Sequence, residues 1–185
     1  DLDGDGLTDV AIATGRALTF LWGDHDGSLY TNPNDYQATP PGGAALQVAT
    51  GDFNEDGALD VAVAGLLADP TGVLLGDGAG GLCPAPDAPT TGEQYSVATG
   101  DLDGDGHLDL VVGELAGIGV LLGYGNGTFA PEVMYGPNEM HPLSIVIEDV
   151  NADQVPDVIV ANWLTNAITV FLGVGDGTLQ PGIDY

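Results

Sequence analysis

The chain has 185 residues, with 28 Asp and Glu against a single Lys or Arg, Arg16, which gives a formal net charge of −27. Binding to phosphate backbones or to anionic lipid requires clustered Lys and Arg, so nucleic-acid binders and proteins that dock on acidic membranes are excluded. Because hydrophobic residues make up 44% of the chain and glycines number 30, an acidic disordered tail is excluded as well.

An acidic segment recurs four times along the chain, at intervals of 51, 49 and 48 residues. Its copies are DLDGDGLTDV (1–10), DFNEDGALDV (52–61), DLDGDGHLDL (101–110) and DVNADQVPDV (149–158). A glycine-rich segment recurs in phase with it, at 20–29, 74–82, 121–129 and 171–179. Two motifs with one period indicate structural repeats within a single domain, 1–185. The predicted repeats are approximately 1–45, 46–94, 95–142 and 143–185.

Short apolar runs rich in Val, Ile and Leu separate these motifs, and each has the length of a strand rather than a helix. Runs of this kind follow the acidic segments at 9–14, 60–65, 109–114 and 157–162, and again at 17–23, 71–76, 118–123 and 167–173. Others precede three acidic segments, at 46–51, 95–100 and 143–148. Weaker runs with a proline, at 128–135 and 178–185, suit outer edge strands. The pattern predicts an all-β chain made of β-propeller blades with four antiparallel strands.

The acidic segments share the spacing D-x-[DN]-x-D-G-x-x-D, and 14 of the 28 acidic residues fall at its positions one, three, five and nine. Carboxylates that alternate on a tight loop converge on one point, and a set of oxygen ligands alone suits a hard cation, usually calcium. We therefore expect up to four Ca²⁺ sites, with a backbone carbonyl at position seven. The predicted ligands are Asp1, Asp3, Asp5, Leu7 and Asp9; Asp52, Asn54, Asp56, Ala58 and Asp60; Asp101, Asp103, Asp105, His107 and Asp109; and Asp149, Asn151, Asp153, Val155 and Asp157.

Two other interpretations of these loops are weaker. An EF-hand needs a Glu at position twelve, which here is Ile12, Val63, Val112 or Val160. Asp/Gly loops that serve only as soluble turns do not explain four copies in register. The third loop, with four carboxylates and a glycine at position six, is expected to be the tightest site. The fourth loop has three carboxylates and Gln154 at that position, so it is expected to be the weakest.

The alternating motifs V-A-x-x-D-x-[DN]-x-D-G-x-x-D-[VL] and L-L-G-x-G-x-G-T-[FL]-x-P resemble the FG-GAP/VCBS repeats over essentially the whole chain. These repeats build the β-propeller of integrin α subunits and of many secreted bacterial proteins. The resemblance implies four-stranded blades with calcium in the loop between a blade's first two strands, held at the ligand positions given above. The chain departs from the pattern at Glu55, Ala152 and Gln154.

The resemblance also raises a question of closure, since family propellers usually have about seven blades. The chain begins inside an acidic loop, so we expect the inner strand of the first repeat upstream of Asp1. Three explanations stay open. The chain is part of a larger propeller, or it closes by pairing two chains, or it forms a four-bladed ring with a gap or a neighbouring chain at its seam.

Other conspicuous residues give weaker signals. Trp22 aligns with leucines of the other repeats and is expected in the core. Trp163 falls at a predicted strand-connecting tip, where it would be available to stack on a sugar or a partner. The single cysteine, Cys83, excludes an intrachain disulfide. No nucleophile–base pair is evident, so no catalytic residue and no organic cofactor are predicted.

The leading hypothesis is an extracellular, calcium-binding, non-enzymatic β-propeller module for adhesion to a protein or glycan ligand. The second is an accessory or catalytic propeller of a secreted polysaccharide-acting enzyme. The third is a structural subunit of a surface assembly that self-associates through blade edges. No nucleic-acid partner and no membrane insertion are expected.

Overall fold

A computed structural model describes residues 1–15, 17–31, 45–65, 70–136 and 140–185 of the chain. The single cation, Arg16, and the stretch 32–44 of the first predicted repeat lie outside these ranges. The described residues form fifteen β-strands and contain no helix. A helix long and apolar enough to cross a membrane is accordingly not found among them.

The strands form four antiparallel sheets, in each of which neighbours in sequence are neighbours in space, as blades of a propeller require. This confirms the predicted all-β fold, and each sheet is called a blade below. The first blade contains β1 (Val10–Ala13), β2 (Leu18–Gly23) and β3 (Leu29–Tyr30), and the second contains β4 (Ala45–Gly51), β5 (Asp60–Gly65), β6 (Gly72–Gly76) and β7 (Leu82–Pro84). The third blade contains β8 (Gln94–Gly100), β9 (Asp109–Glu114), β10 (Gly117–Leu121) and β11 (Val133–Tyr135). The fourth contains β12 (Pro142–Glu148), β13 (Asp157–Asn162), β14 (Ala167–Phe171) and β15 (Ile183–Asp184).

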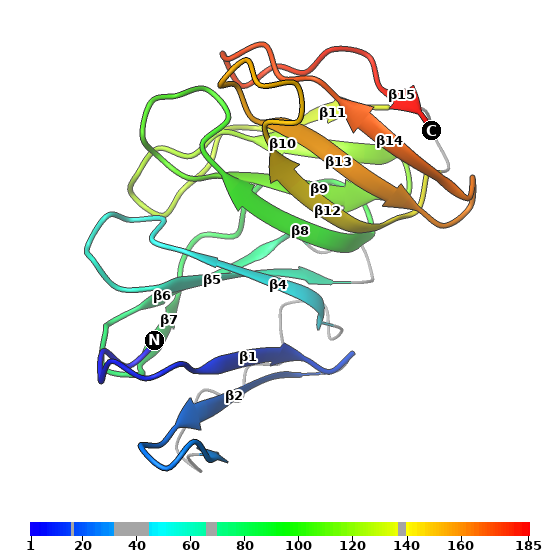
Figure 1. Ribbon diagram of the computed structural model, residues 1–185. Helices are drawn as coiled ribbons and strands as arrows, with labels where there is room; N and C mark the ends of the chain where they lie inside the picture. Colours follow the sequence, from blue (N-terminus) through cyan, green and yellow to red (C-terminus); the bar gives the residue numbers. More distant parts are fainter. Residues whose placement is uncertain (16, 32–44, 66–69, 137–139) are drawn as a thin grey trace.

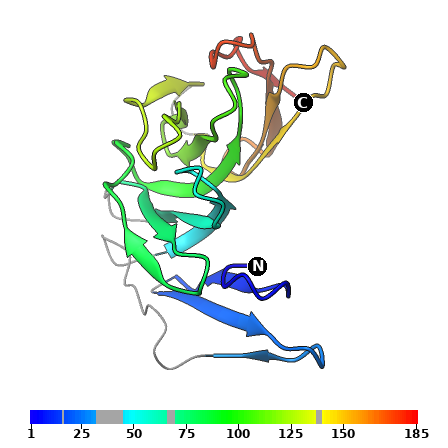
Figure 2. The ribbon, with the colours of Figure 1, turned by 90° about the vertical axis from the view of Figure 1, so that its left-hand side faces the viewer.

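The four blades lie face to face in chain order, with the first blade at one end of the molecule and the fourth at the other (Figure 1). Seen from the side, they fan into an arc, and the two end blades curve toward the same side (Figure 2). The strands β4, β8 and β12 lie side by side along the inside of the arc. Each blade therefore contacts its neighbours mainly through its two flat faces.

Three apolar clusters fill the spaces between consecutive blades. The first and second blades bury Leu18, Phe20 and Trp22 against Val61 and Val63. Trp22 is 3% exposed, so its predicted place in the core is confirmed. The other two clusters join the second blade to the third and the third to the fourth in the same way. Since burial of apolar area is the main stabilising term, the fold depends on blades being stacked.

The outer strands are shorter than the sequence predicted. The run 128–135 forms only β11, and 178–185 forms only β15. Pro131 and Pro181 stand just before these strands and have no N–H to donate to a ladder, so they separate β11 and β15 from the single bridges that Phe129 forms with Gly123 and Leu179 forms with Gly173.

A pair of carboxyl groups lies where the second and third blades meet. Glu114, at the end of β9, is 2% exposed and accepts a hydrogen bond from the N–H of Gly92 (3.1 Å). Glu132 accepts one from the hydroxyl of Thr91 (3.0 Å). Burial, and then the nearby charge of Glu114, raise the pKa of Glu132 to about 7. The contact is therefore most favourable while Glu132 is protonated.

We predict that the free energy of unfolding falls as the pH rises through about 7. A group whose pKa is raised on folding stabilises the protein below its unfolded pKa and loses that contribution above its folded pKa. Glu132→Gln should be more stable than the wild type by about 1 kcal/mol at about pH 8, since water screens part of the repulsion. The two proteins should match at about pH 5 in urea unfolding. A variant that is less stable at both pH values would contradict this account.

Candidate metal centre

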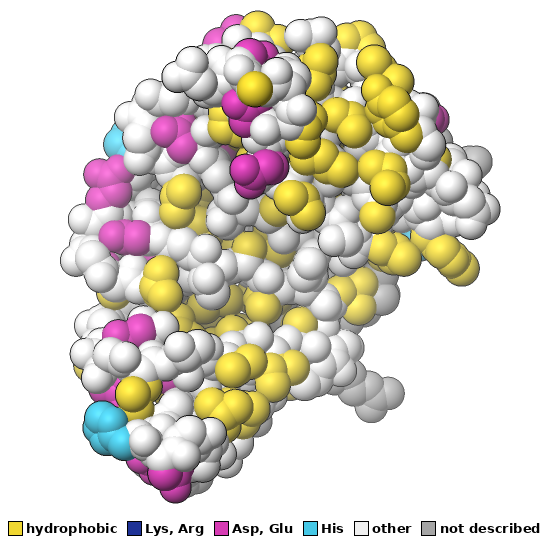
Figure 3. Space-filling model, viewed as in Figure 1, with side chains coloured by type: hydrophobic (Ala, Val, Ile, Leu, Met, Phe, Trp, Pro, Cys, Tyr) yellow, Lys and Arg dark blue, Asp and Glu magenta, His cyan; other side chains and the backbone are white. Residues whose placement is uncertain are grey.

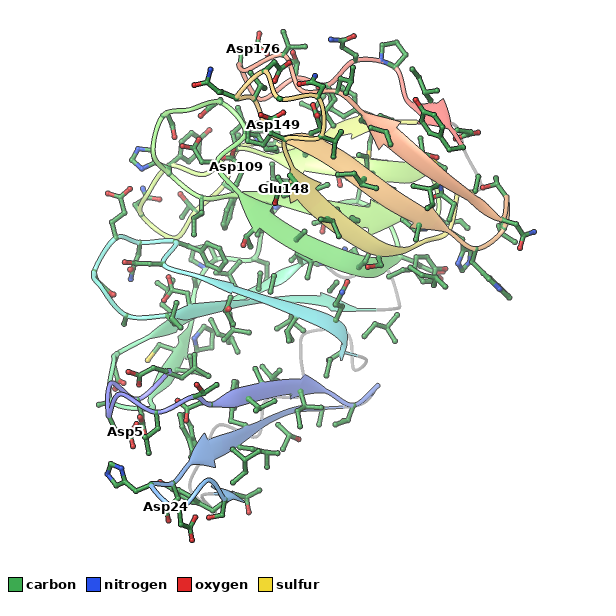
Figure 4. The ribbon with its side chains drawn as sticks, in the orientation of Figure 1. Asp5, Asp24, Asp109, Glu148, Asp149 and Asp176 are labelled. Carbon is green, nitrogen blue, oxygen red and sulfur yellow. The ribbon has the colours of Figure 1, made fainter. Side chains whose placement is uncertain are left out.

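The four acidic loops lie at the same end of their blades. Three of them connect the innermost strand of a blade to the next strand, and the first directly precedes β1. Asp5, Asp109 and Asp149, which belong to three different loops, occur along one side of the molecule in Figure 4. The repeat in sequence therefore becomes a row of equivalent loops in space.

The carboxylate at position nine ties each loop to its blade. In the third loop Asp109 accepts a hydrogen bond from the N–H of Leu102 and another from the N–H of Gly123, both at 2.8 Å. Asp9, Asp60 and Asp157 accept the equivalent pairs of bonds, at 2.6 to 3.0 Å. The donors are the second loop residue and a glycine at or just after the end of the second strand that follows the loop, which is β2, β6, β10 or β14. Position nine is thus a structural anchor, a role that the sequence pattern did not predict.

The other acidic positions organise the loop backbone. The side chain at position one accepts a hydrogen bond from the N–H at position six, as Asp101 does from Gly106 at 3.0 Å. Position three accepts from position five, and position five accepts from position seven, as in Asp105 to Asp103 and His107 to Asp105. All four loops repeat these contacts. The bonds fix the orientation of these side chains against the loop backbone.

Two loops bring three carboxylates within reach of one ion. Oxygen atoms of Asp1, Asp3 and Asp9 lie within 4.8 Å of one another, and so do those of Asp101, Asp103 and Asp109. Position five, the fourth predicted side-chain ligand, is outside both groups. A set made only of hard oxygen donors, each with lone pairs left after its hydrogen bonds, fits calcium.

The second and fourth loops carry one negative charge fewer. Their position three is Asn54 or Asn151, and each amide donates a hydrogen bond to the carboxylate at position five, at 2.9 and 2.8 Å. The amide therefore compensates part of the charge that a cation would compensate in the first and third loops. In those two loops the carboxylates have no such internal counterpart among the described contacts.

Two loop positions adopt a left-handed backbone. Position six has φ between 85° and 92° where it is glycine, and Gln154 is forced to φ 71°. Position four is also left-handed, with Glu55 at φ 58° and Ala152 at φ 64° where the first and third loops have glycine. Glycine marks position six in three of the four loops, whereas it marks position four in only two. Non-glycine residues are strained there, so the second and fourth loops are formed at a higher conformational cost.

Burial disfavours the ionised form of the carboxylate at position nine. Burial raises the pKa of Asp109 to about 6, although the N–H groups of Gly123 and Leu102 oppose this shift. The charges of Asp103 and Asp101 raise it further. Burial also raises the pKa of Asp60. A bound dication would favour the ionised form of these side chains, which is the electrostatic fit expected of a metal loop.

Neighbouring loops also touch. His107, at position seven of the third loop, contacts the carboxylate of Glu55 in the second loop through Nδ1. The hydrogen bond to Glu55 raises the pKa of His107. Both side chains are partly exposed, so this contact links the two loops at the surface of the row.

Family profiles match the chain in two places. The FG-GAP-like repeat profile matches residues 1–63, and the FG-GAP repeat profile matches residues 94–129. The chain belongs to the FG-GAP repeat family. These two FG-GAP matches contain the first, second and third acidic loops. No curated protein matches the chain.

Among solved structures, 24 chains match the FG-GAP chain. One is a lectin from Agrocybe aegerita, described by its specific recognition of non-reducing terminal N-acetylglucosamine. It shares 20% sequence identity with a TM-score of 0.70, and the alignment covers 100% of this chain and 50% of the lectin chain. The FG-GAP chain therefore has the fold of half of that lectin.

We predict that positions three and nine of one loop have separable roles. Asp109→Ala leaves two buried N–H groups unpaired, and it should cost about 4 kcal/mol of unfolding free energy even with a chelator present. Asp103→Ala affects an accessible loop contact and should cost less than about 0.5 kcal/mol under those conditions. Urea unfolding in EDTA tests the difference. Equal costs for the two variants would contradict the anchor role of position nine.

The protonation of Asp109 predicts how calcium binding depends on pH. Calcium requires the ionised carboxylate, so protons compete with it as the pH falls through about 6. Calorimetric titration should give weaker binding at about pH 5 than at about pH 7.5, by a factor of about 10. A pH-independent affinity would argue that Asp109 is no ligand.

Proposed function

We propose that the chain is a calcium-stabilised β-propeller module that binds a glycan or protein ligand outside the cell. The observation that carries the calcium part is the row of four loops with one shared set of contacts. The first and third loops each bring oxygens of three carboxylates within 4.8 Å of one another, and in all four loops position nine is hydrogen-bonded to the blade itself. Calcium would act there as a staple between loop and blade, since the ion neutralises carboxylates that otherwise repel.

The role proposed for the calcium ion is structural, and no catalytic step is assigned to it. Its ligands would be the side chains at positions one, three, five and nine with the carbonyl at position seven, as the sequence predicts. Binding only to the folded chain would add roughly 4 kcal/mol of stability when calcium is at 1,000 times its dissociation constant. An extracellular setting supplies free calcium continuously, which supports the proposed localisation.

The binding part of the proposal rests on the aromatic residues at the other end of the blades. Trp163 lies in the turn between β13 and β14 and is 60% exposed. Its ring meets that of His141 edge-on at 5.6 Å, and His141 meets Tyr95 at 4.1 Å. The backbone N–H of Trp163 donates to the carbonyl of His141, which holds the turn in place. An exposed, supported ring of this kind suits stacking on a sugar.

The fold likeness to a lectin favours a glycan over a protein as the ligand. Recognition of terminal N-acetylglucosamine belongs to that lectin. For this chain the proposal is carbohydrate binding, without a particular sugar.

A glycan array tests the binding part, with the chain presented in calcium. We expect Trp163→Ala to lose at least about 90% of the signal for the glycans that the wild type binds, because one stacked ring contributes about 1 to 3 kcal/mol. Leu164→Ala, which removes a neighbouring side chain that is 50% exposed, is the matched control and should retain binding. No glycan binding by the wild type, together with calcium binding, would overturn only the ligand part of the proposal.

A further inference from the structure

A backbone hydrogen bond connects the second acidic loop to the third blade. The N–H of Gly127 donates to the carbonyl of Phe53, which is position two of the second loop, over 2.8 Å. Gly127 belongs to the turn 123–128, which follows β10. This turn is closed by a bond of 3.0 Å from the N–H of Tyr124 to the carbonyl of Thr128. The second loop is therefore fixed to a turn of the next blade.

This contact brings two of the position-nine anchors into one network. The N–H of Phe53 donates to Asp60, the anchor of the second loop, at 2.7 Å. At the start of the turn, the N–H of Gly123 donates to Asp109, the anchor of the third loop, at 2.8 Å. Hydrogen bonds and short backbone segments thus run without a break from one anchor carboxylate to the other.

Side-chain packing makes this connection stiff. Phe53 is 2% exposed, and its ring meets that of Phe129 edge-on, with the ring centres 5.7 Å apart. Phe129 directly follows the turn and forms a bridge with Gly123, where the turn begins. Because buried side chains are closely packed, a displacement of the second loop at Phe53 also displaces the turn.

A second contact joins the two loops at the surface. Glu55, at position four of the second loop, meets Nδ1 of His107, whose backbone carbonyl is the position-seven ligand predicted for the third loop. A Cβ atom on Gly125 of the turn would lie 2.9 Å from Oε1 of Glu55 and would also overlap the imidazole ring. Both side chains are partly exposed, at the edge of the molecule where Figure 3 shows acidic and histidine side chains along the loops. Two loops and one turn are thus held together at this point.

The other two junctions lack these hydrogen bonds within the part of the chain that the structure describes. The glycines that correspond to Gly127 are Gly80 and Gly177, and neither donates a hydrogen bond to the preceding loop. Position four of the first and third loops is Gly4 or Gly104, which has no side chain to reach the next loop. The hydrogen-bonded connection is therefore specific to the second and third loops.

We propose that calcium binds cooperatively to the second and third loops, so that an ion in one loop raises the affinity of the other. When the third loop is filled, Asp109 and His107 are held in place, and with them the turn. The second loop then orders against partners that are already fixed, so its ordering loses less conformational entropy. This inference rests on the calcium part of the proposed function and makes two of its four sites a coupled pair.

A calcium titration followed by ¹H–¹⁵N NMR tests the coupling loop by loop. The N–H groups at position six, of Gly57, Gly106 and Gln154, report on the second, third and fourth loops. Asp103→Ala, which disables the third loop, should raise the calcium concentration at the Gly57 midpoint by at least about 5-fold. Asp52→Ala should raise the Gly106 midpoint by the same factor, because coupling is reciprocal. The fourth loop is the control for charge alone, and in Asp103→Ala its midpoint should change by less than about 2-fold.

A substitution outside the predicted ligands tests the surface contact. Glu55→Ala removes that contact, and the fourth loop already has alanine at this position, Ala152, at φ 64°. In this background the shift that Asp103→Ala causes in the second loop should shrink by about 2-fold or more, since one of the two connections is lost. Glu93→Ala is the matched control, because it removes the same charge from an exposed residue just before β8, at the opposite end of the blade. It should leave the shift unchanged.

The outcomes separate this inference from the function on which it rests. Calcium binding at both loops with independent midpoints, or an equal shift of the fourth loop, would overturn the coupling and leave the proposed calcium sites intact. A folded chain that binds no calcium at any loop would overturn both. The NMR spectrum of each variant shows directly whether it is folded.

Discussion

The buried carboxylate at position nine is the contact on which the rest of the structure depends. Each one accepts two backbone hydrogen bonds, and so joins the start of an acidic loop to a glycine at the end of the second strand after that loop. Without it, two N–H groups inside every blade would lose their partners. The same side chain faces the other loop carboxylates, so one residue connects blade stability to the electrostatics of the loop.

A second constraint acts between the blades. A blade is a small sheet with two apolar faces, and covering each face by a neighbouring blade stabilises it. The three internal junctions meet this need with matched sets of Val, Leu, Ile and Phe. Trp22 fills the first junction, where it takes the place that leucine holds in the other repeats. The exposed acidic residues lie in loops and turns or, as Glu148 and Asp184 do, at the ends of strands, so they do not oppose this stacking.

The repeat motifs were sufficient to predict the strands, their order and the propeller-like blades. They also predicted that Trp22 is buried and that Trp163 stands on a turn. They could not reveal that position nine is anchored to a glycine fourteen or sixteen residues away, because that contact exists only once two strands have paired. The left-handed backbone of Glu55 and Ala152 was missed for a related reason, since glycine marks that position in only two of the four loops. The metal ligands themselves remain predictions.

The central claim is that the four loops are structural calcium sites held in place by position nine. Native mass spectrometry of the intact chain in the presence of calcium counts bound ions directly. The claim predicts up to four calcium ions per folded chain, with the third loop filled first and the fourth last. A folded chain that retains no calcium while its mass spectrum shows the native charge distribution would contradict it.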